Sequence, residues 1–312
     1  MRVLVVGAGA TGGYFGARLA ASGRDVTFLV RPARAARLAE AGLSVRSPLG
    51  DFRIEAPTTV TAAAIPGPFD LVLLSCKAYD LAGALDDVAP AVGPDTMVLP
   101  ILNGMAHLDA LDARFGRERV LGGSCAIAAT LSPEGAIVQM TELHALTFGE
   151  RDGTRSERVA RVAAVMEGAG FTARLSEKIL LEMWEKWVFL ATLAAGTCLM
   201  RAPIGDIVAA PGGREAMLGL LEECLSIAKA AGEAPREKFV ETSRGTLTAA
   251  GSGFTASMLR DIEKGARIEA DHIVGDLLAR GRAADPDGAW PSLATAYTHL
   301  KAYESRRGRE RG

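Results

Sequence analysis

The first half of the chain alternates short apolar runs with stretches of helical spacing. The apolar runs are rich in β-branched residues, which is typical of strands buried on both faces of a parallel sheet. They are Val3–Val6, Asp25–Val30, Phe69–Ser75 and Thr96–Leu102. Apolar residues recur at helical intervals after the third run, at Leu81, Leu85 and Val88. This alternation predicts a doubly wound α/β sheet.

The remaining apolar runs predict a meander and then a purely helical region. Two short strands, Leu43–Arg46 and Phe52–Ala56, are joined by a turn at Pro48-Leu-Gly50. The later strands, which are nearer the meander type, are Val120–Ala129, Ala136–Met140 and Leu146–Gly149. A helix over Ser156–Gly168 and a strand over Phe171–Leu175 follow them. The later helices are Ser176–Met200, Arg214–Ala231, Arg236–Thr248, Ser257–Arg280 and Ser292–Glu304. We therefore expect two domains, an α/β domain over residues 1–175 and an all-helical domain over residues 176–312.

The first strand runs directly into three glycines with the spacing G-x-G-x-x-G, at Gly7, Gly9 and Gly12. In such a loop the first glycine permits the tight turn, the second lets a pyrophosphate approach the backbone, and the third lets helix and strand pack closely. A helix and a second strand complete a β-α-β unit of about 30 residues. The alternative is a glycine-rich turn without a ligand. The context favours a Rossmann-type dinucleotide site, which includes Ala10.

The residues after the second strand indicate which dinucleotide is bound. An NAD site usually carries an Asp or Glu there, for the ribose hydroxyls. This chain has Arg31 instead, and Arg34 follows one turn later. A guanidinium can bind a 2′-phosphate through two hydrogen bonds, so the sequence predicts NADPH as the cofactor. A solvated basic helix start is the alternative.

Composition and charge narrow the class of protein. The chain has 35 Lys and Arg against 37 Asp and Glu, and no basic cluster is interleaved with aromatic residues, which argues against a nucleic-acid partner. Its four cysteines are widely spaced and its four histidines show no metal spacing, so we expect reduced thiols and no metal. The chain begins at its first strand and its longest apolar run, Val188–Met200, is short for a bilayer. We expect a soluble cytoplasmic protein without a membrane partner, and a homodimer is left open.

Two polar residues follow strands of the predicted parallel sheet. Lys77 comes after Phe69–Ser75, and Asn103 comes after Thr96–Leu102. Ligands of open α/β sheets bind outside the carboxyl ends of the strands, so both could contact a nicotinamide ribose or a substrate carbonyl. The alternatives are a surface lysine and a turn asparagine.

Two charged residues interrupt apolar faces of predicted helices. Lys186 shares a face with Phe189 and Leu190, and Glu269 falls within an apolar stripe of the helix predicted over Ser257–Arg280. Buried charges require partners, so Lys186 and Glu269 are natural candidates for each other. An ammonium placed there could protonate a carbonyl oxygen as hydride reaches the carbon. The alternative for Lys186 is a lysine that reaches solvent at the domain edge.

With these residues together, the chain resembles the ketopantoate reductase (2-dehydropantoate 2-reductase) family along nearly its whole length. The resemblance rests on Gly7-Ala-Gly-Ala-Thr-Gly-Gly13, Arg31, Cys76-Lys-Ala78, Leu102-Asn-Gly-Met105, Trp184-Glu-Lys186, and Ser257-Met-Leu-Arg-Asp-Ile262 with Glu269. It implies that Lys186 is the general acid and Glu269 its acidic partner. It also implies that Lys77 and Asn103 lie near the nicotinamide and substrate, that Ser257 binds substrate, and that Arg31 binds the 2′-phosphate. Ser257 could instead cap its helix.

The chain departs from the family at three substrate positions. Well-characterised members place asparagines where this chain has Leu190, Ala194 and Ile204. Losing such partners weakens recognition of a substrate hydroxyl. Arg201 lies close by in the sequence and could clamp a substrate carboxylate, or could serve only as a cation at a helix C-terminus.

The resemblance implies NADPH-dependent reduction of the small 2-oxo acid ketopantoate to pantoate, in pantothenate and coenzyme A biosynthesis. One alternative is a related reductase acting on another 2-oxo acid or ketone. A second is an NADPH-binding sensor without catalytic activity.

Overall fold

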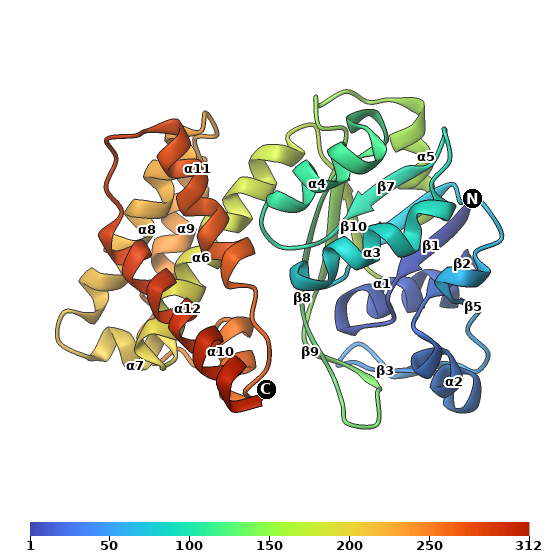
Figure 1. Ribbon diagram of the computed structural model, residues 1–312, viewed down its shortest axis with the longest axis horizontal. Helices are drawn as coiled ribbons and strands as arrows, with labels where there is room; N and C mark the ends of the chain where they lie inside the picture. The colour runs from blue at the N-terminus through green and yellow to red at the C-terminus, as the bar shows by residue number, and fades with distance from the viewer. Residues whose placement is uncertain (312) are drawn as a thin grey trace. The chain divides into compact units, whose positions relative to one another are not determined.

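A computed structural model describes residues 1–311, which form two compact units (Figure 1). The first unit contains Met1–Leu102 and His107–Leu180. The second contains Asn103–Ala106 and the chain from Leu181 onward. The predicted fold class is confirmed, because a parallel-sheet domain is followed by an all-helical one.

The first sheet of the first unit is parallel, with the strand order β5-β2-β1-β6-β7. Its strands are β1 (Arg2–Val6), β2 (Asp25–Leu29), β5 (Thr59–Val60), β6 (Leu71–Leu74) and β7 (Met97–Pro100). Every residue of β6 and β7 is buried, as the unbroken apolar runs predict. The helices along this part of the chain are α1 (Ala10–Ala21), α2 (Pro32–Ala41), α3 (Leu81–Val88) and α4 (Ala106–Phe115).

A second sheet in the same unit has the order β10-β9-β3-β4, and β8 pairs with β9. Its strands are β3 (Leu43–Arg46), β4 (Phe52–Ile54), β8 (Gly122–Leu131), β9 (Ile137–Gly149) and β10 (Thr172–Leu175), and α5 (Glu157–Met166) precedes β10. The prediction of two separate strands over 136–140 and 146–149 is wrong. They form one long strand, because β8 pairs antiparallel along it and absorbs the mismatch in an irregularity between Ile127 and Ala129.

Helix α1 joins the two sheets into one core. It contacts β1 and β2 of the first sheet and β3, β4, β8 and β9 of the second. Tyr14 and Phe15 are fully buried in it, and the Tyr14 hydroxyl donates to the Gln139 side-chain oxygen at 2.8 Å. The N-terminus of α1 is therefore fixed by packing on both sides.

The second unit contains helices only, within the residues the structure describes. They are α6 (Ile179–Met200), which begins in the last residues of the first unit, α7 (Ile204–Ala209), α8 (Gly213–Ala230), α9 (Glu237–Leu247), α10 (Ser257–Glu263), a π-helix (Asp271–Gly275), α11 (Asp276–Ala284) and α12 (Pro291–Arg311). Both α11 and α12 pack on α8. None of the helices within residues 1–311 is long and apolar enough to cross a membrane.

The prediction of one helix over Ser257–Arg280 is wrong. Helix α10 ends at Glu263, and the chain then turns at Gly265, whose φ of +63° lies in the left-handed region that favours glycine. Residues 266–269 are not helical, and the π-helix begins at Asp271. Glu269 therefore lies just before a helix and not within a helical stripe.

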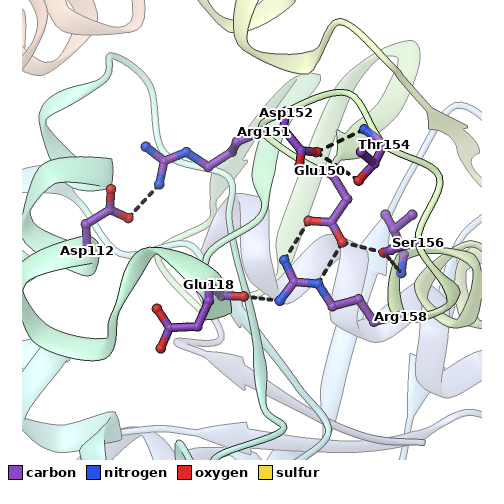
Figure 2. Close-up of polar contacts among 9 residues, drawn as sticks. Asp112, Glu118, Glu150, Arg151, Asp152, Thr154, Ser156 and Arg158 are labelled. Atoms are coloured by element: carbon purple, nitrogen blue, oxygen red, sulfur yellow. Dashed lines mark hydrogen bonds and ion pairs between the residues drawn. The ribbon is translucent and has the colours of Figure 1, made fainter.

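A buried carboxylate organises the polar cluster between β9 and α5, shown in Figure 2. Glu150 is 6% exposed and accepts hydrogen bonds from the Ser156 hydroxyl and from two nitrogens of Arg158, Nε at 2.6 Å and Nη2 at 2.5 Å. Arg158 also donates to the Glu118 carbonyl oxygen. These hydrogen bonds favour the charged carboxylate and hold the Glu150 pKa below its ordinary value, although burial alone would raise it.

Replacing Glu150 with glutamine should destabilise the protein in a pH-dependent way. Because the folded pKa is lowered, the carboxylate contributes stability above its ordinary value of 4.5 and loses that contribution as the pH falls through the folded pKa. We expect Glu150→Gln to cost about 1–3 kcal/mol near pH 7. The cost should shrink as the pH falls below 4.5. Urea unfolding over a pH series measures it.

The matched control is Glu118→Gln. Its carboxylate is 68% exposed and pairs with Arg119 at the surface, while the bond to Arg158 uses the Glu118 backbone, which the change preserves. We expect less than about 1 kcal/mol for the control. A Glu150→Gln cost that stays constant from pH 7 to below the folded pKa would contradict the assignment.

Candidate functional site

The glycine loop connects β1 to α1 in the conformation that its spacing predicts. Gly7 has a φ of +89°, in the left-handed region. A Cβ on Gly12 would lie 1.7 Å from the Ser75 hydroxyl oxygen, so only glycine allows α1 to pass this close to the end of β6. Around Gly9, by contrast, a Cβ would meet no atom within 4 Å. The loop therefore leaves open space at the position where the motif brings a phosphate to the backbone.

The N-terminus of α1 has the electrostatics of an anion site. Its N-cap, Gly9, offers no side-chain hydrogen bond, and the first turn carries no acidic residue. Within the described residues, neither a capping side chain nor an acid of the first turn offsets the first backbone N–H groups and the positive end of the helix dipole. These features fit the pyrophosphate of a dinucleotide.

Arg31 directly precedes α2 and its side chain is 80% exposed. Its Nη2 lies 3.6 Å from the Asp80 carboxylate, on the short helix that follows β6. Sequence reasoning did not find Asp80, because it lies about fifty positions away along the chain. Arg34, by contrast, donates to the backbone carbonyls of Ala8, at 3.2 Å, and Gly135, at 3.0 Å. Of the two arginines, Arg31 is the one with an exposed guanidinium beside the loop-bearing end of the first sheet.

Lys77 and Asn103 follow neighbouring strands but belong to different units. Lys77 is exposed at the N-cap of the short helix after β6. Asn103 follows β7 and is grouped by its contacts with the helical unit. The His272 ring donates to the Asn103 backbone carbonyl, and a Cβ on Gly104 would lie 2.8 Å from the His272 carbonyl oxygen. His272 thus holds the Asn103–Gly104 turn, and burial lowers its pKa.

Lys186 lies on α6, half-buried beside two buried tryptophans, Trp184 and Trp187. The Trp187 indole N–H donates to the Ile273 carbonyl oxygen at 2.8 Å, inside the π-helix. The Ile273 N–H in turn donates to the Glu269 backbone carbonyl at 3.0 Å. The turn of α6 that carries Lys186 is therefore bonded to the segment that begins at Glu269, which is also half-buried. π-Helical turns of this kind are frequent at functional sites.

Glu185, the residue before Lys186, is a buried acid whose role sequence reasoning missed. It is 4% exposed and accepts hydrogen bonds from the Arg236 backbone N–H and Nε, both at 2.9 Å, and from Arg236 Nη2. This fork ties the start of α9 to the middle of α6. In the sequence, the position of this acid between two tryptophans could have predicted its burial. A buried charge requires a partner, so a pairing residue could have been expected.

Ser257 and Arg201 lie at helix ends. Ser257 is the first residue of α10 and is exposed, and the N-cap of that helix is Ala256, so the capping role is not observed. Arg201 follows α6 with a φ of +54°, the one positive φ among the non-glycine residues within 1–311. The N–H of Ala202 donates to the Thr197 carbonyl at 3.3 Å, as in a Schellman C-cap, where the position of Arg201 is usually glycine.

The three positions that depart from the family are apolar and shielded. Ala194 is 3% exposed and Ile204 is fully buried, while Leu190 on the same helix as Lys186 is half-buried. Within residues 1–311, no group of three His, Cys, Asp or Glu side chains could hold a metal ion.

Both units of the chain match known proteins of the same family. Residues 3–153 match the family described as ketopantoate reductase PanE/ApbA, and residues 178–304 match its C-terminal domain. An uncharacterized oxidoreductase of Bacillus subtilis, YkpB, is 36% identical over 98% of this chain and 99% of its own length. A 2-dehydropantoate 2-reductase of Halobacterium salinarum is 30% identical, covering 95% and 96%.

Solved structures show the same fold. The 2-dehydropantoate 2-reductase of Geobacter metallireducens superposes with a TM-score of 0.86 at 29% identity, over 97% of this chain and 99% of that one. D-mandelate dehydrogenase, solved with NADH and anilino(oxo)acetate, shares the fold with a TM-score of 0.87 at 20% identity, over 99% and 100%. Both halves of the chain match in sequence and fold, and the protein therefore belongs to the ketopantoate reductase PanE/ApbA family.

Proposed function

We propose that this protein is an NADPH-dependent reductase of a small 2-oxo acid, with ketopantoate, reduced to pantoate, as the first substrate to test. The observation that carries the proposal is Lys186, a half-buried lysine beside two buried tryptophans in the family's helical domain. A lysine in such a place is suited to proton transfer at a bound ligand.

In this proposal the first unit holds the coenzyme. The backbone of the Gly7–Gly12 loop, with Ala10, binds the pyrophosphate at the uncapped start of α1, and the exposed Arg31 guanidinium binds the 2′-phosphate. Lys77 lies beside the nicotinamide ribose. When bound, NADPH would supply the hydride that reduces the substrate carbonyl.

The second unit supplies the residues that act on the substrate. Lys186 donates a proton to the carbonyl oxygen, which develops negative charge as the carbon is reduced. Glu269 orients that ammonium. Asn103, in the turn held by His272, donates to the substrate or the nicotinamide amide. Ser257 and Arg201 bind the substrate carboxylate.

The test is a panel of 2-oxo acids, each assayed with NADPH and with NADH. Support for the proposal is turnover of ketopantoate with a kcat/KM for NADPH that clearly exceeds the value for NADH. Tight NADPH binding without turnover of any 2-oxo acid would instead support the sensor alternative.

The buried Ala194 and Ile204 favour a second candidate within the same class. Where the family places amides, these side chains offer no hydrogen bond to a substrate hydroxyl. A 2-oxo acid with an apolar substituent would meet better complementarity there. A kcat/KM for such an acid far above that for ketopantoate would select this candidate.

Replacing Arg201 with glycine separates its two possible roles. Glycine relieves the left-handed strain and should leave stability unchanged or raise it by about 1 kcal/mol. If Arg201 clamps the substrate carboxylate, the KM for the 2-oxo acid should rise about tenfold or more. Steady-state kinetics and thermal unfolding on the same preparation measure both. An unchanged KM would leave Arg201 as a helix-terminal cation only.

A further inference from the structure

A cavity of about 540 Å³ lies within the first unit, lined by residues of α2, β3, β4 and the turn between β8 and β9. Figure 1 shows α2 beside β3 in this part of the unit. The charged residues that line it are Arg34, Arg37, Arg46, Arg53, Asp51 and Glu134. Neither Arg31 nor Gly7, Gly9 and Gly12 of the coenzyme loop line it. The cavity is therefore lined by other residues than the proposed coenzyme contacts, although Arg34 also donates to the Ala8 carbonyl of the coenzyme loop.

The positive charge of this cavity is only partly offset from within, because four arginines line it against Asp51 and Glu134, and the Glu134 carboxylate interacts with Arg46. Within residues 1–311, Arg53 pairs with Glu55 at 3.0 Å, whereas Arg34, Arg37 and Arg46 form no ion pair. The Asp51 carboxylate accepts the Ser47 N–H at 2.8 Å.

Two of the guanidiniums are held in place by backbone oxygens. Arg34 Nη2 donates to the Ala8 and Gly135 carbonyls, and Arg37 Nη2 donates to the Glu134 carbonyl at 2.6 Å. A guanidinium carries five N–H donors, so most donors of this pair remain available to a ligand. Both guanidiniums lie against Gly135, where a Cβ would be 2.6 Å from Arg37 Nη2 and 2.7 Å from Arg34 Nη1. Partial burial and the charge of Arg37 lower the pKa of Arg34.

We propose that this cavity binds a small polyanion, a molecule with two or more phosphate or carboxylate groups, at a site distinct from the coenzyme site. Arg34 and Arg37 form a fixed pair that matches one oxyanion group, and Arg46 contacts a second. The volume falls within the usual range for small-molecule sites. The half-buried Phe52 ring supplies an apolar wall, and Arg18 already stacks on it, with its guanidinium carbon 4.6 Å from the ring centroid.

The test is isothermal titration of inorganic tripolyphosphate, and separately of citrate, into the full-length protein at 0.15 M salt, where exposed charges are screened. Binding of one probe or both is expected, and the stronger probe identifies phosphate or carboxylate as the preferred group. Arg46→Ala and Arg37→Ala should each weaken that binding about tenfold or more. The Arg46 side chain makes no hydrogen bond within the described residues, and the substitution preserves the backbone pairing of Arg46 with Val138, so we expect the fold to be retained.

Two control variants locate the bound probe. Arg31→Ala removes the guanidinium beside the coenzyme loop, and Arg114→Ala removes an exposed arginine that pairs with Asp86 at 3.2 Å elsewhere in the unit. Both should retain the wild-type affinity for the probe. Loss of affinity in Arg31→Ala with retention in Arg46→Ala would place the anion at the coenzyme loop and overturn the proposal. Failure of both probes to bind at millimolar concentration would also overturn it.

Discussion

Replacing Lys186 with alanine should lower kcat for the 2-oxo acid by about 10²–10⁴-fold and leave the Kd for NADPH unchanged. When the carbonyl of the 2-oxo acid is reduced, its oxygen must gain a proton. A positioned general acid contributes a rate factor of this size. Coenzyme binding should be unaffected because Lys186 is not among the proposed coenzyme contacts, which lie in the first unit apart from Asn103. Single-turnover kinetics and fluorescence titration of NADPH measure the two quantities.

The control is Lys229→Ala, an exposed lysine near the end of α8 in the same unit. It should keep wild-type kcat. Lys186→Arg adds a second comparison, because it preserves the positive charge but a guanidinium does not release its proton. A kcat for Lys186→Ala within a factor of three of wild type would exclude Lys186 as the acid.

Replacing Arg236 with alanine should destabilise the protein by about 3 kcal/mol. The Glu185 side chain is 5% exposed, and the substitution removes its two bonds to the guanidinium. Removing one partner of a buried pair costs about 3–5 kcal/mol because the other charge stays buried. We expect the lower end, because the Arg236 backbone N–H still donates to Glu185 and the guanidinium is 51% exposed. Urea unfolding measures the change.

Arg244→Ala is the matched control for this change. Arg244 lies on α9, the helix that begins directly after Arg236, and it pairs with Glu222, but both side chains are more than half exposed. We expect less than about 1 kcal/mol from its loss. Equal losses of stability in the two variants would show that the burial of Glu185 does not increase the stability that its ion pair contributes.

The parts of the fold that follow from local chemistry could be predicted. The strand–glycine–helix unit follows from apolar runs and from steric demands at Gly7 and Gly12, which depend on residues nearby in the fold. The start of β9 and its end were both predicted, but their continuity depends on pairing with β8. Pairing between strands is a long-range property that a local pattern does not carry.

In the candidate site too, local features could be predicted from the sequence and long-range contacts could not. Lys186 and Glu269 were found as charges among apolar residues, a local signal. The prediction that Glu269 lies in a helical stripe is wrong, because Gly265 turns the chain after α10. The helical spacing of apolar residues in the sequence continues across this point, although the helical hydrogen bonding is broken there. The contact of His272 with Asn103, and that of Glu185 with Arg236, join residues far apart in the sequence, so they became visible only in the structure.

The grouping of Asn103–Ala106 with the helices bears on how this family could diversify. These four residues are encoded between strand β7 and the rest of the first unit, far upstream of Leu181. A single genetic crossover near position 180 would exchange every later helix but leave the Asn103 turn behind. Such a hybrid would pair the His272 of one parent with the turn of the other, so the substrate contact proposed for Asn103 would not be inherited together with the helices.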